Sequence, residues 1–250
     1  MGYRRVNVNI AATTVENYRR LKDAGIGTYI LFQETYHKEN YEALHPTGPK
    51  SNYAYHTEAM DRAMEGGVDD VGIGVLFGLD KYRYEFAGLL MHAEHLEAAF
   101  GVGPHTISVP RLRHADDINA DEFDNGIDDD TFAKIVACIR IAVPYTGMII
   151  STRESQKCRE RVSAPWASPQ ISGGSRTSVG GYCEPEPDDA KSEQFDVSDT
   201  RTLDEVVRWL MEMDYIPSFV LPAIGKAAPE TASCLFARAV RSRTAAIQMH

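Results

Sequence analysis

Five short segments of this chain hold residues of the kinds that bind cofactors and substrates. They are "FQETYH", "GIGVLFGL", "GPHTISVPR", "STRES" and "GGSRTSVGGY", with the candidates Gln33, Glu34, His37, Gly74, Gly78, His105, Arg111, Arg153, Glu154, Ser175, Arg176 and Thr177. The last segment could bind an anion, because backbone N–H groups converge in glycine-rich turns, or it could be only a flexible loop. Each candidate alone also has a structural interpretation: a rim ion pair, a hydrogen-bonded histidine, or a glycine that allows close packing on a sheet. Five such segments in one chain favour a shared site.

Each of these segments lies at or just after a predicted strand. Apolar runs predict strands at 6–10, 26–35, 70–79, 105–111 and 147–154, and a shorter one within 169–181; helical periodicity predicts helices at 14–25, 56–67, 84–101, 131–144 and within 202–219. This alternation predicts βα units and a parallel sheet. Parallel strands bring their C-terminal ends to one rim, so we expect His105, Arg153 and Glu34 to converge on one face.

The number of predicted units is smaller than a closed barrel requires. We count about five βα units, whereas a (β/α)₈ barrel needs eight. The missing units must lie upstream or not exist. Because "RRVNVNIAATT" already reads as the middle of a domain, Met1 is interpreted as an internal start.

Composition and charge exclude several classes of partner. The 250 residues are 43% hydrophobic, enough for a sizeable core, and carry a formal net charge of -10. There is no basic stripe, so no nucleic acid partner is expected. No apolar run is long enough to cross a membrane and the N-terminus lacks a signal peptide, which predicts a cytoplasmic protein. The cysteines, Cys138, Cys158, Cys183 and Cys234, have no C-x-x-C spacing and are interpreted as thiols.

The longest motifs resemble one family. The chain resembles the radical S-adenosylmethionine tyrosine lyases of [FeFe]-hydrogenase maturation in "RRVNVNIAATTVENYRRLKDAGIGTYILFQETYHKENYEALHPTGPKSNY", "DRAMEGGVDDVGIGVLFGLDKYRYE", "FGVGPHTISVPR", "VPYTGMIISTRES" and "QISGGSRTSVGGY". The resemblance covers most of residues 4–219. The related 2-iminoacetate synthase of thiamine synthesis shares part of the pattern.

The resemblance implies an α/β fold in three parts. Residues 1–115 would be the C-terminal part of a (β/α)₈ radical S-adenosylmethionine barrel, 116–219 a region shared with biotin and thiamine synthases, and 220–250 an aberrant tail. The implied reaction cleaves the Cα–Cβ bond of L-tyrosine to p-cresol and dehydroglycine. A second iron–sulfur cluster then makes CO and cyanide for the hydrogenase, with other maturation proteins as partners.

The resemblance also implies site residues. Glu34 would hold the methionyl or ribose part of S-adenosylmethionine, and Gly74, Val75, Leu76, Phe77 and Gly78 would pack against its adenine. His105 would be a ligand or near neighbour of a labile iron at the second cluster, since neutral imidazole suits iron. Arg153, with Ser175 and Thr177, would receive the tyrosine carboxylate, because a guanidinium fork matches its two oxygens.

Two features depart from the family pattern. The C-x-x-x-C-x-x-C loop that holds the [4Fe–4S] cluster does not occur in the 250 residues, because the family places it upstream of where this chain begins. The family's second cysteine site, C-x-x-C followed by a distant cysteine, is expected directly after "YIPSF", where this chain reads "VLPAIGKAAPETASC". A shift of reading frame after Phe219 permits three cysteines at the family spacing, so we interpret the tail as frameshifted rather than divergent.

The sequence thus predicts a C-terminal fragment of the tyrosine lyase, inactive as it stands because it lacks cluster ligands. The cysteine spacing permitted by the shifted frame favours this enzyme over 2-iminoacetate synthase. The alternatives left open are a non-catalytic or binding-only remnant, and a half-barrel completed by pairing with another chain.

Overall fold

The computed structural model describes residues 6–113, 123–163, 171–173, 198–215 and 217. The chain divides into two compact units, residues 1–203 and 204–250, and each is described by itself. The first unit holds the sheet and all but one of the described helices. The second unit contributes the remaining helix.

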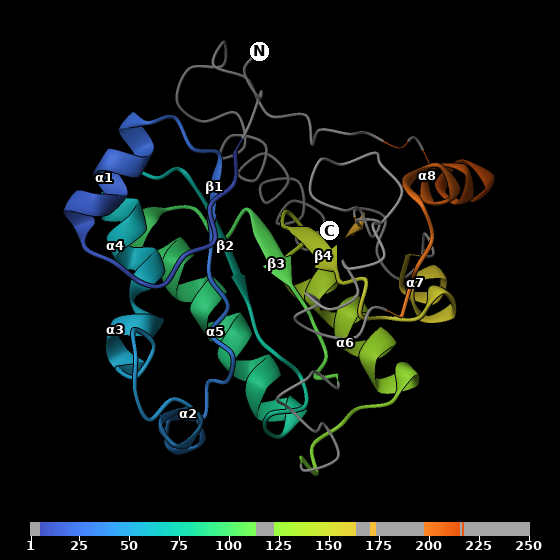
Figure 1. Ribbon diagram of the computed structural model, residues 1–250, viewed down its shortest axis with the longest axis horizontal. Helices are drawn as coiled ribbons and strands as arrows, with labels where there is room; N and C mark the ends of the chain where they lie inside the picture. The colour runs from blue at the N-terminus through green and yellow to red at the C-terminus, as the bar shows by residue number, and fades with distance from the viewer. Residues whose placement is uncertain (1–5, 114–122, 164–170, 174–197, 216, 218–250) are drawn as a thin grey trace, which may run out of the picture. The chain divides into compact units, whose positions relative to one another are not determined.

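One parallel sheet forms the centre of the first unit (Figure 1). Its strands lie in chain order: β1 (Thr28–Ile30), β2 (Asp70–Gly74), β3 (Thr106–Ser108), β4 (Gly147–Ile150) and β5 (Ile171–Gly173). The predicted strand at 6–10 appears as a parallel bridge between Val8 and Tyr29, beyond the β1 edge. The predicted parallel sheet is therefore confirmed.

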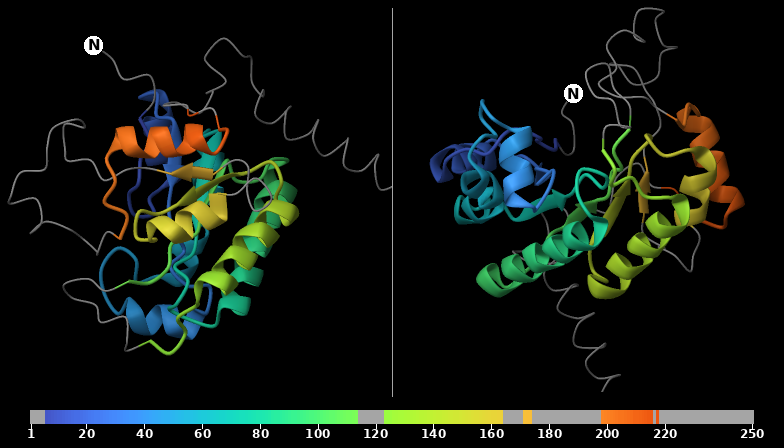
Figure 2. Two further views of the ribbon diagram at one scale, coloured as in Figure 1. Left: turned by 90° about the vertical axis from the view of Figure 1, so that its right-hand side faces the viewer. Right: turned by 90° about the horizontal axis from the view of Figure 1, so that it is seen from below.

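The helices follow the strands in the way that βα units require. They are α1 (Val15–Asp23), α2 (Lys38–Leu44), α3 (Tyr53–Thr57), α4 (Ala59–Glu65), α5 (Tyr82–Phe100), α6 (Asp129–Ala142), α7 (Gln156–Ser163) and, in the second unit, α8 (Leu203–Glu212). The sequence missed α2 and α7, whose short polar segments carry too few apolar residues for a helical pattern. Helix α4 contacts α5, α5 contacts α6, and α6 contacts α7, so the helices form a continuous layer (Figure 2).

Local signals fix several helix ends. The side chain of Thr14 accepts a hydrogen bond from the Asn17 amide at the start of α1, and Asp128 accepts one from the Thr131 amide (2.6 Å) at the start of α6. Helix α5 ends at Gly101, whose φ of 74° is in the left-handed region. None of the described helices is both long and apolar enough to cross a lipid bilayer.

Alternate residues of the strands form the core with the helices. This core contains residues of the strands and of the segments that directly follow them: Tyr29, Leu31, Val71, Ile73, Val75, Phe77, Ile107, Val109, Met148 and Ile150. Because successive side chains of a strand point to opposite faces, the intervening residues lie on the other face of the sheet.

Two glycines of β2 lie on this other face of the sheet. A Cβ on Gly72 would be 2.5 Å from Oγ1 of Thr106, and a Cβ on Gly74 would be 2.8 Å from the carbonyl oxygen of Ser108 and 2.9 Å from Cδ1 of Phe32. The space above these glycines is therefore filled by residues of the neighbouring strands. The close approach occurs within the sheet, not between the sheet and a helix as the structural interpretation of Gly74 supposed.

We expect Gly74→Ala to lower the free energy of unfolding by about 1–3 kcal/mol, because the added methyl group overpacks against the backbone of β3. Urea denaturation followed by circular dichroism measures the change. Gly126→Ala is the matched control, since a Cβ at Gly126 meets nothing within 4 Å. Equal stabilities of the two variants would contradict the packing described for β2.

Candidate cofactor and substrate site

The segments that follow β1, β2 and β3 are joined to one another by backbone hydrogen bonds. The amide of Gln33 donates to the carbonyl of Gly74 (2.8 Å), and the amide of Leu76 donates to the carbonyl of Glu34 (2.9 Å). The amide of Phe77 donates to Pro110 in the same way (2.9 Å). The segments after β1, β2 and β3 are thus fixed to one another at the C-terminal edge of the sheet, as expected for a parallel sheet.

Glu34 lies at this edge in an unusual backbone conformation. Its φ is 68°, in the left-handed region that residues other than glycine seldom adopt. Its half-buried carboxylate forms an ion pair with Nζ of Lys50, a residue that the sequence did not single out. A strained residue held beside a charged partner is a common feature of ligand-binding sites.

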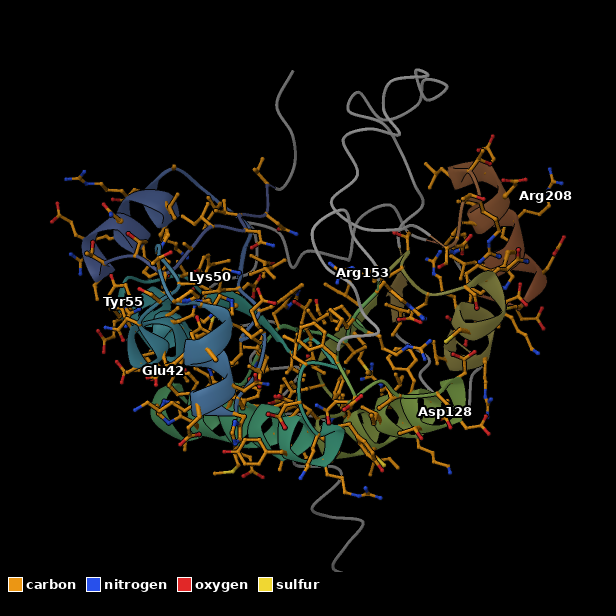
Figure 3. The ribbon with its side chains drawn as sticks, turned by 60° about the horizontal axis from the view of Figure 1, so that its bottom comes forward. Glu42, Lys50, Tyr55, Asp128, Arg153 and Arg208 are labelled. Carbon is orange, nitrogen blue, oxygen red and sulfur yellow. The ribbon has the colours of Figure 1, made fainter. Side chains whose placement is uncertain are left out.

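Arg153 reaches the same edge from the turn after β4. Its amide donates to the side-chain oxygen of Ser151 (3.1 Å). Burial lowers the pKa of Arg153, while the negative charges of Glu34 and Glu154 raise it. Figure 3 labels Arg153 and Lys50, two of the basic side chains in the segments that follow the strands.

The segment after β2 presents little side chain to a ligand. Val75 and Phe77 are buried in the core shared with the helices, whereas Leu76 between them is only half-buried and belongs to the opposite face. Gly78 has a φ of 119°, which few other residues adopt. Adenine packing by residues 74–78, which stays a prediction, would fall to the backbone and to Leu76.

His105 lies at the opposite end of the sheet, where the strands begin. It immediately precedes β3, its amide donates to Val71 (2.8 Å), and its Nδ1 is 3.7 Å from Oδ1 of Asp70, at the start of β2. The predicted convergence of His105 with Glu34 and Arg153 is therefore wrong. The direction of the strand was the missed signal, since a residue that precedes a strand belongs to its N-terminal edge.

Two other candidates have structural roles. His37 caps α2, with Nδ1 accepting a hydrogen bond from the Asn40 amide (3.3 Å). Nε2 of Gln33 donates to Oγ1 of Thr57 (2.9 Å), which ties the loop after β1 to α3. Ser175, Arg176 and Thr177 lie outside the described residues, so their assignments stay predictions.

A buried ion cluster connects the ends of β3 and β4. Arg111 donates to the carboxylate of Glu154, to Oδ1 of Asp129 (2.7 Å) and to the carbonyl of Ile127 (3.0 Å). Arg113 donates to the same oxygen of Glu154 (2.8 Å). The Glu154 side chain is 0% exposed, and these two arginines are its ion-pair partners. The sequence suggested rim ion pairs but not this buried network.

The same cluster contains the one group of metal-ligand type found in the described part of the chain. Asp129, Glu154 and Cys158 lie close together, but Nη2 of Arg111 already contacts all three. Burial and the charge of Glu154 raise the pKa of Cys158 to about 12, so it is a thiol and not a thiolate. Cys138 is exposed on a different helix. The described residues therefore do not fit an iron–sulfur cluster.

A second buried ion pair holds a distant segment against the turn after β4. The amides of Ser198 and Asp199 both donate to the carbonyl of Thr152 (3.1 Å each), and Nη1 of Arg159 donates to Asp199 (2.6 Å). Burial alone would raise the pKa of Asp199, but hydrogen bonds from Arg201 and Arg159 lower it to about 2. Residues 198–201 thus support the turn that carries Arg153.

Comparison with known proteins gives this arrangement its context. Residues 108–216 match the Biotin and Thiamin Synthesis associated domain. The chain is 30% identical over 197 residues to the 2-iminoacetate synthase of Salmonella typhimurium, covering 78% of this chain and 51% of that protein. A crystal structure of HydG, a maturase of the [FeFe]-hydrogenase, superposes with a TM-score of 0.78 at 58% identity, covering 88% of this chain and 47% of HydG.

The chain is similar to HydG and to the 2-iminoacetate synthases, which are radical S-adenosylmethionine enzymes. HydG from Carboxydothermus hydrogenoformans also matches, with a TM-score of 0.75, 42% identity, and coverage of 94% of this chain and 52% of that one. The chain spans about half the length of the relatives it matches. The predicted fold, part of a radical S-adenosylmethionine (β/α)₈ barrel with its associated domain, is confirmed.

Proposed function

We propose that this chain is part of a lyase that cleaves the Cα–Cβ bond of L-tyrosine to p-cresol and dehydroglycine. The observation that carries the proposal is the position of Glu34 and Arg153, which lie in the segments after β1 and β4 at the C-terminal end of the sheet. Ligands of (β/α)₈ barrels bind at this edge, and the two side chains supply the opposite charges that a cofactor and an amino acid require.

In this proposal the residues at the edge bind and orient the two ligands. The carboxylate of Glu34 accepts hydrogen bonds from the methionyl or ribose part of S-adenosylmethionine while it holds Lys50. The guanidinium of Arg153 holds the tyrosine carboxylate through paired N–H donors. S-adenosylmethionine, together with an iron–sulfur cluster, supplies radical chemistry when bound.

Residues 151–154 are well supported for this role. The turn is fixed by the Arg111–Glu154 pair and by the amides of Ser198 and Asp199, which donate to the carbonyl of Thr152 within it. A substrate-binding arginine on a fixed turn loses less conformational entropy on binding than one on a mobile loop. This support favours a carboxylate-binding role for Arg153.

His105 would serve a separate site. Because it lies at the N-terminal edge of β3, an iron bound there would be on the opposite side of the sheet from Glu34. The proposal therefore places the production of CO and cyanide, which uses the second cluster, at a distance from tyrosine cleavage. Other hydrogenase maturation proteins would receive the products in the cytoplasm.

The alternative function is the 2-iminoacetate synthase reaction of thiamine synthesis. The identities of 58% and 42% to the two HydG structures exceed the 30% identity to the synthase of Salmonella typhimurium. Sequence similarity of this size favours the hydrogenase maturation enzyme.

We expect the chain to bind S-adenosylhomocysteine, and we expect Glu34→Gln to weaken that binding about tenfold, as for loss of one charged hydrogen bond. Isothermal titration calorimetry on the 250-residue chain measures the affinity. Glu42→Gln is the control, because Glu42 is an exposed residue of α2 and is labelled in Figure 3. An unchanged affinity of the Glu34 variant would remove Glu34 from the cofactor site.

A further inference from the structure

A buried carboxylate on α5 holds the loop that follows β1. Glu85 has no exposed surface, and its Oε2 accepts a hydrogen bond from the amide of Tyr36 (2.8 Å). Its Oε1 accepts one from Oγ1 of Thr35. No lysine or arginine in the described part of the chain forms an ion pair with Glu85. Its partners are therefore the two residues that directly follow Glu34.

Three residues on one side of α5 contact Tyr36. One turn after Glu85, a Cβ on Gly88 would lie 2.5 Å from Cγ of the Tyr36 ring, so the ring packs directly on the helix backbone. One turn further, Nδ1 of His92 lies 2.9 Å from the Tyr36 hydroxyl. Positions 85, 88 and 92 share one face of a helix. This stripe contacts Tyr36 from its amide to its hydroxyl.

This contact bears on Glu34 because a left-handed residue needs support on both sides. On the N-terminal side, Gln33 is fixed by Gly74 and Thr57. On the C-terminal side, Thr35 and Tyr36 contact α5, and the carbonyl of Tyr36 also accepts a hydrogen bond from the hydroxyl of Tyr53 (2.8 Å). A φ of 68° at Glu34 is unfavourable for a side chain with a Cβ, so it persists only where the flanking residues impose it.

We propose that Glu85 is a positioning residue, which imposes the left-handed conformation of Glu34 and so directs its carboxylate to the cofactor edge. The link to the cofactor rests on the proposed function; the control of the loop conformation does not. Hydrogen bonding, not charge, carries the effect. The hydroxyl of Thr35 accepts from the His37 amide (3.1 Å), so its proton is directed to Glu85.

This distinction makes Glu85→Gln informative. A glutamine can accept from the Tyr36 amide through Oε1 and donate through Nε2 to the second lone pair of the Thr35 hydroxyl, whose proton then turns away from residue 85. Both contacts therefore survive in a neutral side chain, one of them with its direction reversed. Glu85→Leu removes both contacts. Thr35→Val removes one of them, together with the hydrogen bond that Thr35 accepts from the His37 amide, and keeps the buried shape, which provides a second variant if Glu85→Leu does not fold. Glu94→Leu, at an exposed position of α5, is the control.

Two measurements on the 250-residue chain test the proposal. Hydrogen exchange reports on the Leu76 amide, which donates to the carbonyl of Glu34. Calorimetry reports on the affinity for S-adenosylhomocysteine. We expect Glu85→Leu and Thr35→Val to accelerate Leu76 exchange and to weaken S-adenosylhomocysteine binding, each about tenfold. Glu85→Gln and Glu94→Leu should stay within about threefold of the original chain in both measurements.

The outcomes distinguish the control of the loop conformation from the role of Glu34 in cofactor binding. Unchanged exchange of the Leu76 amide in both Glu85→Leu and Thr35→Val overturns the positioning role, whatever the affinity. Faster exchange in a chain that never binds S-adenosylhomocysteine supports the control of the loop and refutes the cofactor role of this edge. A loss in Glu85→Gln as large as in Glu85→Leu refutes hydrogen bonding as the cause.

Discussion

Replacement of Arg111 by methionine should lower the free energy of unfolding by about 3 kcal/mol. The guanidinium of Arg111 donates hydrogen bonds to the buried carboxylate of Glu154 and to Asp129. Its Cζ also lies 4.5 Å from the centroid of the Phe132 ring. Methionine fills the volume but leaves Glu154 with the single hydrogen bond from Arg113. Because this hydrogen bond remains, we expect a loss of stability at the lower end of the range of about 3–5 kcal/mol for broken buried ion pairs. Urea denaturation at neutral pH measures the loss.

Two further variants test the cause of this loss. Arg161→Met breaks an exposed ion pair between α7 and α6, with Asp130, and should cost less than about 1 kcal/mol. Combining Arg111→Met with Glu154→Leu should recover part of the loss, because no buried charge is then left behind. If the Arg111 and Arg161 variants are equally stable, Glu154 is not the buried charge that the structure describes.

The second large effect concerns the proposed cleavage of L-tyrosine. We consider a hybrid in which residues 4–217 replace the matching part of the HydG with 58% identity. Arg153→Gln in this hybrid should reduce kcat/KM for L-tyrosine about a hundredfold, since losing one partner of a desolvated charge pair costs about 2–5 kcal/mol. Anaerobic production of p-cresol measures the change.

The control for this prediction is Arg20→Gln, an exposed residue of α1 paired with Glu16. It should leave kcat/KM unchanged within about twofold. Arg153→Lys should recover little, because an ammonium group does not provide the paired donors of a guanidinium. Full activity of Arg153→Gln would assign the tyrosine carboxylate to another residue, with Ser175 and Thr177 as the next candidates.

The sequence by itself determined the order of the elements and the nature of the sheet. Apolar runs between amphipathic helices predicted parallel strands, because buried strands of βα units are apolar on both faces. It also placed Glu34 and Arg153 at one end of the sheet, since each lies near the end of a predicted strand, but it wrongly placed His105 there as well. The left-handed φ of Glu34 left no such signal: glutamate is not a residue that marks this conformation, unlike Gly78 or Gly101.

Only the tertiary structure decided which side chains face one another. The partners of Glu85 lie 49 and 50 residues away, and Arg111 lies 43 residues from Glu154. No local period encodes such pairs, because they arise from the packing of neighbouring βα units. The sheet also assigned Val75 and Phe77 to the core and His105 to the opposite edge from Arg153. A residue's type states which chemistry it can perform, but strand direction and the alternation of faces decide where that chemistry is available.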